Sequence, residues 1–297
     1  MSYFQIVVLA LIQGMAELLP VSSTAHVIVA AKLMNQDPSS SHMTFLLIML
    51  HTGTMFAVLF YFWPRWRPML FPPAQPNGES AAQVSRFHFL KMVVLATAIT
   101  GVLGYGLIMF IEKVILIKLM GHEKGEVEHL FKVLPLMAAA LFAVGLIIIA
   151  AGLRRVTTES KHLTARPAIL IGVVQALCLP FRGFSRSGAT ISTGLFCGLS
   201  RSLAEEFSFA LAVAITPPAI IREVYRLLKD KDKGWQGSSE LFQLLLPGVV
   251  GMGFSFVAGL LALKFLSVVL EKGRWQYFGY YCLVAAGGVL AVWGMGY

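Results

Sequence analysis

Charged residues are scarce in this sequence: Asp, Glu, Lys and Arg together make up 13% of its 297 residues, whereas hydrophobic residues make up 57%. Soluble domains average about 25% charged residues, so this composition excludes an ordinary soluble protein and predicts a polytopic membrane protein. We expect a single integral membrane domain over residues 1–297. The long apolar runs are 43–63, 89–111, 134–153, 207–221, 241–270 and 277–297.

These runs also lack the alternation of apolar and polar residues that marks the strands of a membrane β-barrel. Most of them reach the roughly 20 residues with which an α-helix crosses a hydrocarbon core of about 30 Å. Backbone groups inside lipid must be hydrogen-bonded within the protein, and only helices suit such continuous runs. We therefore predict an all-α fold.

Cysteine is rare as well, and the three present are Cys178, Cys197 and Cys282. An odd number of cysteines in apolar surroundings gives no disulfide framework and predicts buried thiols. The start of the chain lacks a basic region before its first apolar stretch, which argues against a cleaved signal peptide.

Positive charge is in excess, with a formal net charge of +9 at pH 7. The basic residues are spread through short loops and do not gather on one soluble face, so we expect no nucleic-acid partner. Loops 63–91 and 153–166 are rich in Lys and Arg, which predicts a cytoplasmic location for both. Loop 112–132 has equal numbers of basic and acidic residues among its Lys and Glu, so we expect it on the side of the membrane opposite the cytoplasm.

Two further apolar segments are too broken to span a bilayer as single helices. Segment 3–33 is interrupted by LPVSSTAH at 19–26, and segment 167–199 is interrupted by CLPFRGFSRSGAT at 178–190. We call these interruptions the first and the second elbow. Proline ends helices, so each segment is predicted to form two short helices joined at its elbow, a re-entrant hairpin.

The order of parts around the two elbows is similar, since Gln13 precedes the first and Gln175 the second. This order indicates an internal repeat, with copies at about 1–153 and 167–297, each a hairpin plus three transmembrane helices. An odd number of crossings inverts the second copy. Paired interruptions in inverted halves predict a binding site where the elbows meet near the membrane midplane, which lipids and their headgroups can reach.

The first elbow carries an unusual set of polar groups for a membrane segment. Gln13 and Glu17 are four residues apart and share one face of a helix. A carboxylate at membrane depth costs about 2.5 kcal/mol or more, which favours a functional role over a Glu that neighbouring donors satisfy or that stays protonated. The hydroxyls of Ser22, Ser23 and Thr24 could bind a ligand or could only cap the next helix.

The second elbow supplies the complementary charge. Arg186 is flanked by Ser185 and Ser187 and followed by Gly188 at the expected start of a helix. A guanidinium, hydroxyls and a helix N-terminus suit a phosphate group, so we expect an anionic ligand. The alternative is a structural ion pair between Arg186 and Glu17.

The two elbows together suit phosphoryl transfer, in which positioning and charge neutralisation carry most of the catalysis. Oxygen ligands from Glu17 and Gln13 would favour a hard divalent cation, Mg or Ca, over zinc. The sequence has no zinc-type spacing of Cys and His, no phosphate-binding lysine loop and no dinucleotide-binding glycine pattern.

Both elbows resemble the motifs of the undecaprenyl-diphosphate phosphatase family, also called the bacitracin-resistance protein family, and the likeness extends over nearly the whole chain. The first motif is matched at Gln13, Glu17, Pro20, Ser22, Ser23, Thr24 and His26. The second is matched at Gly183, Ser185, Arg186, Ser187, Gly188, Ala189 and Thr190. Arg182 stands where the family has proline, and it could join the pocket or reach the membrane interface.

The resemblance implies a multi-pass enzyme of the bacterial inner membrane. Its reaction would be the removal of the terminal phosphate from undecaprenyl diphosphate or another polyprenyl diphosphate, which regenerates the lipid carrier for cell-wall synthesis. The resemblance also implies a metal-associated pair, Glu17 and Gln13, and a diphosphate clamp, Arg186. The expected substrate-binding residues are Ser22, Thr24, Ser185, Ser187 and Gly188.

Two points about the chemistry stay open at this stage. Ser23 is the candidate nucleophile, with His26 as general base or acid, but attack by water with His26 or Glu17 as base is equally compatible. His51, in the stretch LHTGT, is expected to have a structural or supporting role.

Other protein classes share some of these features. A transporter or flippase of isoprenoid phosphates would use the same inverted architecture to bind without cleaving. A phosphatase of the type-2 phosphatidic acid class needs a downstream His and Asp, which ISTGLFCGLSRS does not provide. The sequence leaves open whether the protein is a monomer or a homodimer.

Overall fold

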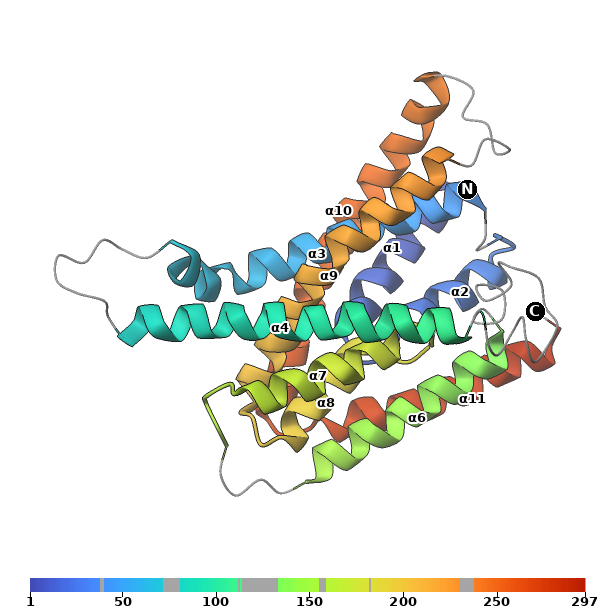
Figure 1. Cartoon of the computed structure of the whole chain (residues 1–297). Coiled ribbons are helices and arrows are strands. Elements are labelled where there is room, and N and C mark those ends of the chain that lie inside the picture. The colour runs from blue at the N-terminus through green and yellow to red at the C-terminus, as the bar shows by residue number, and fades with distance from the viewer. Residues whose placement is uncertain are drawn as a thin grey trace.

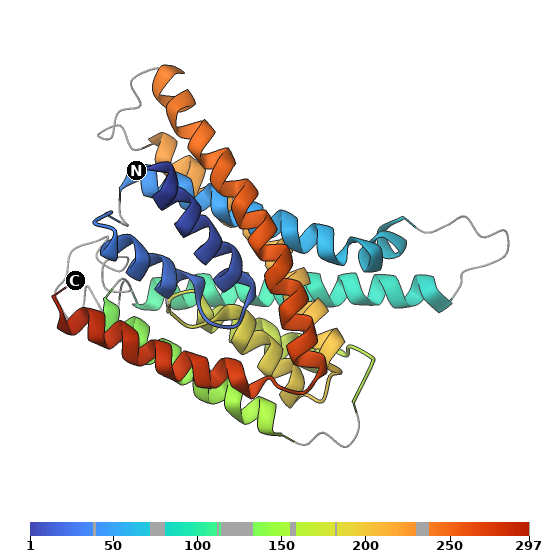
Figure 2. The same ribbon diagram turned by 180° about the vertical axis from the view of Figure 1, so that it is seen from behind.

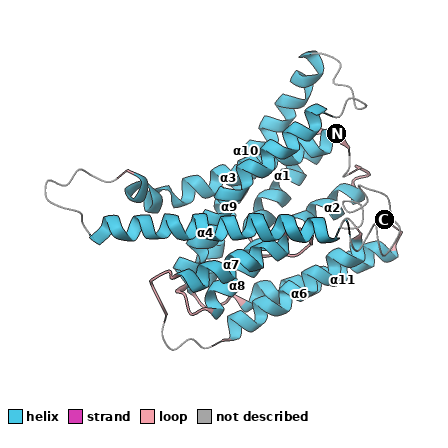
Figure 3. Cartoon of the chain, viewed as in Figure 1, coloured by secondary structure: helices cyan, strands magenta, loops and turns pink. Residues whose placement is uncertain are grey.

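The computed structural model describes residues 1–37, 40–71, 81–111, 113, 133–154, 159–181, 183–229 and 238–296. Helices make up almost all of the regular structure in these ranges (Figures 1 and 3). The helices are α1 Tyr3–Leu18, α2 Ser23–Leu33, α3 Ser41–Leu70, α4 Ala81–Phe110, α6 Leu134–Leu153, α7 Ala165–Cys178, α8 Arg186–Phe196, α9 Arg201–Lys229, α10 Ser238–Glu271 and α11 Gln276–Gly294.

Six of these helices are long and apolar enough to cross a membrane, which confirms the predicted polytopic fold. The spans are His42–Met69, Phe87–Phe110, Leu134–Leu153, Arg201–Tyr225, Leu245–Glu271 and Gln276–Gly294. The fourth span begins before the predicted run 207–221 and includes Glu205, which is 2% exposed. The Ser267 hydroxyl donates to Glu205 Oε1 over 2.5 Å, so this acid is paired inside the bundle and does not end the helix.

Both interrupted segments form pairs of short helices, as predicted. Helices α1 and α2 have 16 and 11 residues, and α7 and α8 have 14 and 11. At 1.5 Å per residue, none of the four reaches across a hydrocarbon core of about 30 Å. The members of each pair contact one another, and Figure 2 shows the α1–α2 turn directed into the bundle.

Each hairpin packs against a long helix from the other half of the chain: α1 against α10 and α7 against α4. Glycine permits both contacts. A Cβ on Gly14 would lie 2.6 Å from the carbonyl oxygen of Ser255, and one on Gly172 would lie 2.7 Å from that of Ala96. In the predicted repeat, α1 corresponds to α7 and α4 corresponds to α10, so the two contacts are equivalent. The opposite orientation of the two halves stays a prediction.

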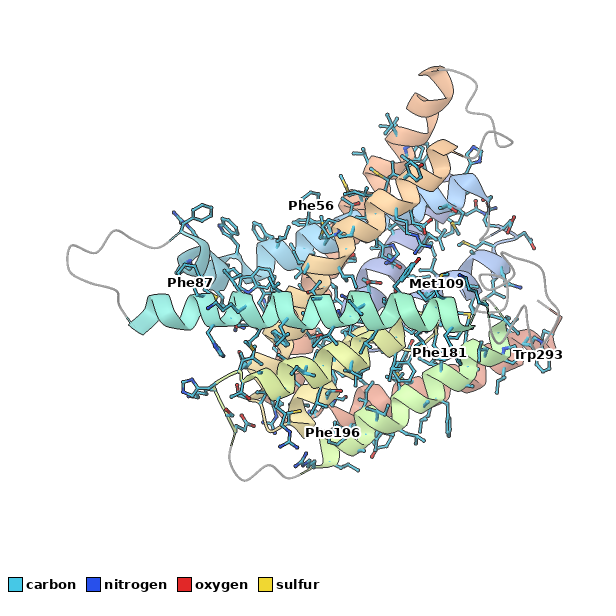
Figure 4. The ribbon with its side chains drawn as sticks, viewed as in Figure 1. Phe56, Phe87, Met109, Phe181, Phe196 and Trp293 are labelled. Atoms are coloured by element: carbon cyan, nitrogen blue, oxygen red, sulfur yellow. The ribbon has the colours of Figure 1, made fainter. Side chains whose placement is uncertain are left out.

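The outer surface of the bundle is rich in large apolar side chains. Phe56, Phe87 and Trp293 point away from the helices in Figure 4, and each is about half exposed. A soluble protein would hide such residues, whereas hydrocarbon solvates them. Most of the predicted loop 112–132, and Arg182, lie outside the described residues.

All three cysteines are free thiols, which confirms that they form no disulfide. Cys178 and Cys282 are buried as predicted, but Cys197 is only half buried. It lies at the end of α8, where the chain turns toward α9 and part of the side chain stays uncovered.

Candidate active site

The last turn of α1 places a carboxylate at the first elbow. Gln13 lies one turn before Glu17, and its Nε2 donates to Glu17 Oε2 over 3.2 Å. Across the elbow, the hydroxyl of Ser23, the first residue of α2, donates to the same carboxylate oxygen over 2.5 Å. The four-residue spacing thus brings Gln13 and Glu17 together as predicted, and the elbow adds Ser23.

The backbone of the first elbow is strained at Ser22, which has φ 66° and ψ 92°. Residues with a side chain seldom occupy this region, and those that do cluster at functional sites. Ser22 is the N-cap residue of α2, yet its hydroxyl makes no capping hydrogen bond within the described structure. Capping therefore does not explain this hydroxyl. Thr24, the second residue of α2, is half buried.

The second elbow is capped by its own side chain. The Ser185 hydroxyl accepts a hydrogen bond from the backbone N–H of Gly188 over 3.2 Å, and Arg186 opens α8. Gly183 has φ +102°, and a Cβ there would lie 2.6 Å from the carbonyl oxygen of Met137. Glycine is therefore required at this turn.

The two elbows touch. The Ser187 hydroxyl donates to the carbonyl oxygen of Leu19 over 3.3 Å, and a Cβ on Gly188 would lie 3.3 Å from Cβ of Pro20. These contacts join residues from opposite halves of the chain, as the paired interruptions predict.

Arg186 and Glu17 form an ion pair at this meeting point, with 3.3 Å between Nη2 and Oε1. The pair alone would fit a structural role. However, Arg186 Nη1 and Gln13 Oε1 are both buried without a hydrogen-bond partner among the described residues. Buried polar atoms are rarely left unpaired, so one free donor and one free acceptor at the same place indicate a ligand. An anion could accept a hydrogen bond from Arg186 Nη1, and a cation or a hydrogen-bond donor could bind Gln13 Oε1.

A pocket opens beside this ion pair. Its lining comprises Glu17, Leu18, His51, Thr54, Met55, Val58, Arg186, Ala212, Val213 and Thr216. The charged groups Glu17 and Arg186 come from α1 and α8, and α3 and α9, which Figure 1 labels, add both apolar and polar side chains. The pocket thus has a charged end and a lining of mixed polarity.

His51 belongs to this pocket, although the sequence suggested only a supporting role. Its Nδ1 donates to the carbonyl oxygen of Leu47 over 2.7 Å, which leaves Nε2 directed toward Glu17 Oε2 at 3.7 Å. His51 lies on α3 and Glu17 on α1, so no spacing along the chain could reveal that they are close. The sequence indicated only that His51 is an imidazole within an apolar run.

His26 is not one of the residues that line the described pocket. Its Nδ1 lies 2.8 Å from the carbonyl oxygen of Ser22, and its Nε2 lies 2.8 Å from the hydroxyl of Tyr281 on α11. The structure therefore does not bring His26 to the Glu17–Arg186 pair. The predicted role of His26 as acid or base stays a prediction.

No group of three or more His, Cys, Asp or Glu side chains that could hold a metal occurs in the described ranges. The possible metal-ligand atoms near Glu17 are mainly oxygens, from its own carboxylate, the Ser23 hydroxyl and the Gln13 amide, with one imidazole nitrogen, His51 Nε2, 3.7 Å from Glu17 Oε2. Such a set fits a hard cation such as Mg or Ca better than zinc.

The fold and the site define a class of polytopic membrane proteins in which two short helical hairpins bring together a partly buried acid–guanidinium pair. The sequence matches the family described as Bacitracin resistance protein BacA over residues 6–288, and the chain belongs to that family.

Similar proteins match over almost their full lengths. Undecaprenyl-diphosphatase 2 of Acinetobacter baylyi is 53% identical over 98% of each chain. Undecaprenyl-diphosphatase of Desulfatibacillum aliphaticivorans is 32% identical over 98% of each chain. Undecaprenyl-diphosphatase 1 of Clostridioides difficile is 32% identical over 97% of this chain and 95% of its own.

Proposed function

We propose that this protein is a membrane phosphatase that hydrolyses undecaprenyl diphosphate to the monophosphate and inorganic phosphate, and so recycles a lipid carrier for cell-wall synthesis. The observation that carries this proposal is the partly buried Arg186–Glu17 pair with an unpaired Arg186 Nη1 beside a partly apolar pocket. The names of the similar proteins support the same substrate.

Arg186 would bind the diphosphate through its free Nη1. Binding there adds an anion beside a carboxylate, so further positive charge is needed. The N-terminus of α8, at Ser187 and Gly188, contributes partial positive charge, and the Ser185 cap, which accepts a hydrogen bond from the Gly188 N–H, holds this turn in place. Ser22 and Thr24, at the start of α2, are the proposed substrate contacts from the first elbow.

Ser23 is the proposed nucleophile. Its hydroxyl already donates to Glu17 Oε2, so Glu17 can take the proton as Ser23 Oγ bonds to the terminal phosphorus. The bond from phosphorus to the bridging oxygen breaks, and the lipid monophosphate leaves. Water then hydrolyses the phosphoserine. Direct attack by water with Glu17 as base gives the same products and remains the alternative route.

A divalent cation, Mg or Ca, is the proposed cofactor, held by Glu17 and Gln13. Gln13 contacts the carboxylate through Nε2, and the Oε1 of the same amide has no hydrogen-bond partner among the described residues, which supports this assignment. When bound, such a cation supplies charge neutralisation for the phosphate oxygens.

The test uses the purified protein in phospholipid nanodiscs with undecaprenyl diphosphate. Phosphate release is expected, and EDTA or Glu17→Ala should abolish it. Glu159→Ala serves as the control, because this acid is 40% exposed and pairs with Arg201. Binding without phosphate release would overturn the phosphatase proposal and favour a carrier of isoprenoid phosphates.

We also propose the bacterial inner membrane as the location, with the C-terminal ends of α3 and α6, which carry Arg65 and Arg154, facing the cytoplasm. Cysteine substitutions at these two positions should react with a membrane-impermeant reagent only after the cells are opened. Labelling in intact cells would reverse the proposed orientation. The molecular mass of the purified protein in detergent would show whether the protein is a homodimer.

A further inference from the structure

Helix α11 contacts the first elbow at two successive residues. The Cys282 thiol donates to the carbonyl oxygen of Pro20 over 3.3 Å. The hydroxyl of Tyr281 lies 2.8 Å from Nε2 of His26, and the two rings stack with centroids 5.7 Å apart and planes 14° apart. The proposed reaction uses neither residue of α11.

The hydrogen-bond partners of His26 fix the direction of each bond. A carbonyl oxygen has no hydrogen, so His26 Nδ1 is the donor to Ser22. Nε2 of the neutral ring is then an acceptor, and the Tyr281 hydroxyl donates to it. Both ring nitrogens are thus engaged by residues that do not line the described pocket.

The residue that His26 holds is the strained one. Ser22 has φ 66°, and its carbonyl oxygen accepts from both the side chain and the backbone N–H of His26, at 2.8 and 3.5 Å. The next residue is Ser23, whose hydroxyl lies 2.5 Å from Glu17 Oε2. A change in the backbone of Ser22 would therefore move the hydroxyl of Ser23.

We propose that Tyr281 and His26 are a positioning pair: Tyr281 orients the imidazole, the imidazole holds Ser22 in its left-handed conformation, and Ser22 sets the Ser23 hydroxyl against Glu17. The proposal rests on the proposed phosphatase function. It gives His26 a role different from acid–base catalysis, and it assigns a role to Tyr281.

The first experiment compares His26→Asn with His26→Ala in the phosphate-release assay. The Asn Nδ2 can occupy the place of Nδ1 and donate to Ser22, but an amide cannot accept or release a proton at neutral pH. We expect Asn to keep kcat within about tenfold of the native value and Ala to lose about 100-fold, as misplacement of a reacting group does. The pH profile of the Asn variant should match the native profile. An equal and large loss in both variants would overturn the proposal in favour of a general base or acid.

The second experiment is a rescue. Glycine adopts a positive φ without strain, so His26→Ala should cost less kcat in a Ser22→Gly background than in the native background. Ser22→Gly alone is the reference, because the hydroxyl of Ser22 is also a proposed substrate contact. A merely structural role of His26 elsewhere in the fold would not respond to a change at Ser22, so an equal cost of His26→Ala in both backgrounds would count against the proposal.

The third experiment tests Tyr281. Tyr281→Phe should lower kcat about threefold to tenfold with little change in KM, and it should have no further effect in the His26→Ala background, because coupled residues are not additive. Tyr280→Phe, the matched control on α11, is 45% exposed and should be silent. Additive losses from Tyr281→Phe and His26→Ala would contradict the pairing.

A readout that needs no activity separates this inference from the proposed function. Nitrogen-15 NMR of labelled histidine should show His26 as the Nδ1–H tautomer, with an Nε2 signal that shifts in Tyr281→Phe. An Nε2–H tautomer would overturn the positioning pair. Absence of phosphate release by the native protein, with these signals present, would overturn only the phosphatase.

Discussion

The two elbows meet at one site but are held in different ways. In the second, Ser185 caps the following helix and glycine takes the left-handed position at Gly183. In the first, Ser22 takes that position without a side-chain cap in the described structure, and support comes from Ser187 of the other elbow and from α11. The second elbow therefore carries its own cap and a glycine turn, whereas the first elbow, which has the proposed reacting groups, depends more on its neighbours.

The helices that lead into the elbows differ as well. Glu17 follows Gln13 by four residues in α1, whereas the corresponding position after Gln175 is Leu179, which is 40% exposed. Gln175 Nε2 donates to the Thr100 hydroxyl over 3.2 Å instead. One half thus supplies the carboxylate and the other the guanidinium, so a single site results from two similar hairpins.

The largest effect should follow removal of the carboxylate. We expect Glu17→Ala to lower kcat/KM by about 1,000-fold or more, because the proton acceptor for Ser23 and one proposed metal ligand are lost together. The measurement is phosphate release under conditions in which thermal unfolding shows a folded sample. Adding Leu179→Glu in the second hairpin should not restore activity. Recovery there would mean that the two hairpins are interchangeable.

Arg186→Lys tests the guanidinium that the second hairpin supplies. A lysine keeps the charge but has no planar fork, so we expect kcat/KM to fall about 100-fold. Arg201→Lys is the matched control, since its side chain is 42% exposed and pairs with Glu159 near the surface. Native activity in Arg186→Lys would remove the guanidinium from the proposed phosphate site.

Much of this architecture could be predicted from the sequence, because the hydrophobic effect and backbone pairing in lipid act locally along the chain. The apolar runs, the proline-interrupted segments and the Gln13–Glu17 spacing all follow from such local rules. The position of His51 in the pocket, and the contact between Tyr281 and His26, depend on how distant helices pack. Ser22 shows a further limit, since its hydroxyl lies at a helix start but does not cap it.

A smaller effect, on stability, should follow a substitution at Gly183, the left-handed position of the second elbow. Gly183→Ala introduces a side chain at φ +102° and 2.6 Å from the Met137 carbonyl oxygen, so we expect a loss of about 1–3 kcal/mol in the free energy of unfolding. Denaturation in detergent measures it. Gly101→Ala is the control, because its Cβ would meet no atom within 4 Å. Equal stability of the two variants would show that Gly183 is not needed for the turn.

The smallest effect concerns the helix caps. Ser185→Ala removes a capping hydroxyl from α8 and should cost about 1 kcal/mol of the free energy of unfolding. Ser22→Ala removes a hydroxyl that caps nothing in the described part of the chain, so its effect on unfolding should be near zero. A comparable loss in Ser22→Ala would refute the distinction between a self-capped and an externally supported elbow.

The glycine contacts of the two hairpins also limit how the site can move. At Gly14 and at Gly172 the backbone of the hairpin lies close against α10 or α4, with backbone atoms and, at Gly14, only the short side chain of Ala258 at the contact. The α1–α10 and α4–α7 pairs should therefore behave as rigid bodies. Any motion that admits a lipid headgroup must take place between these pairs, with the hinges outside them.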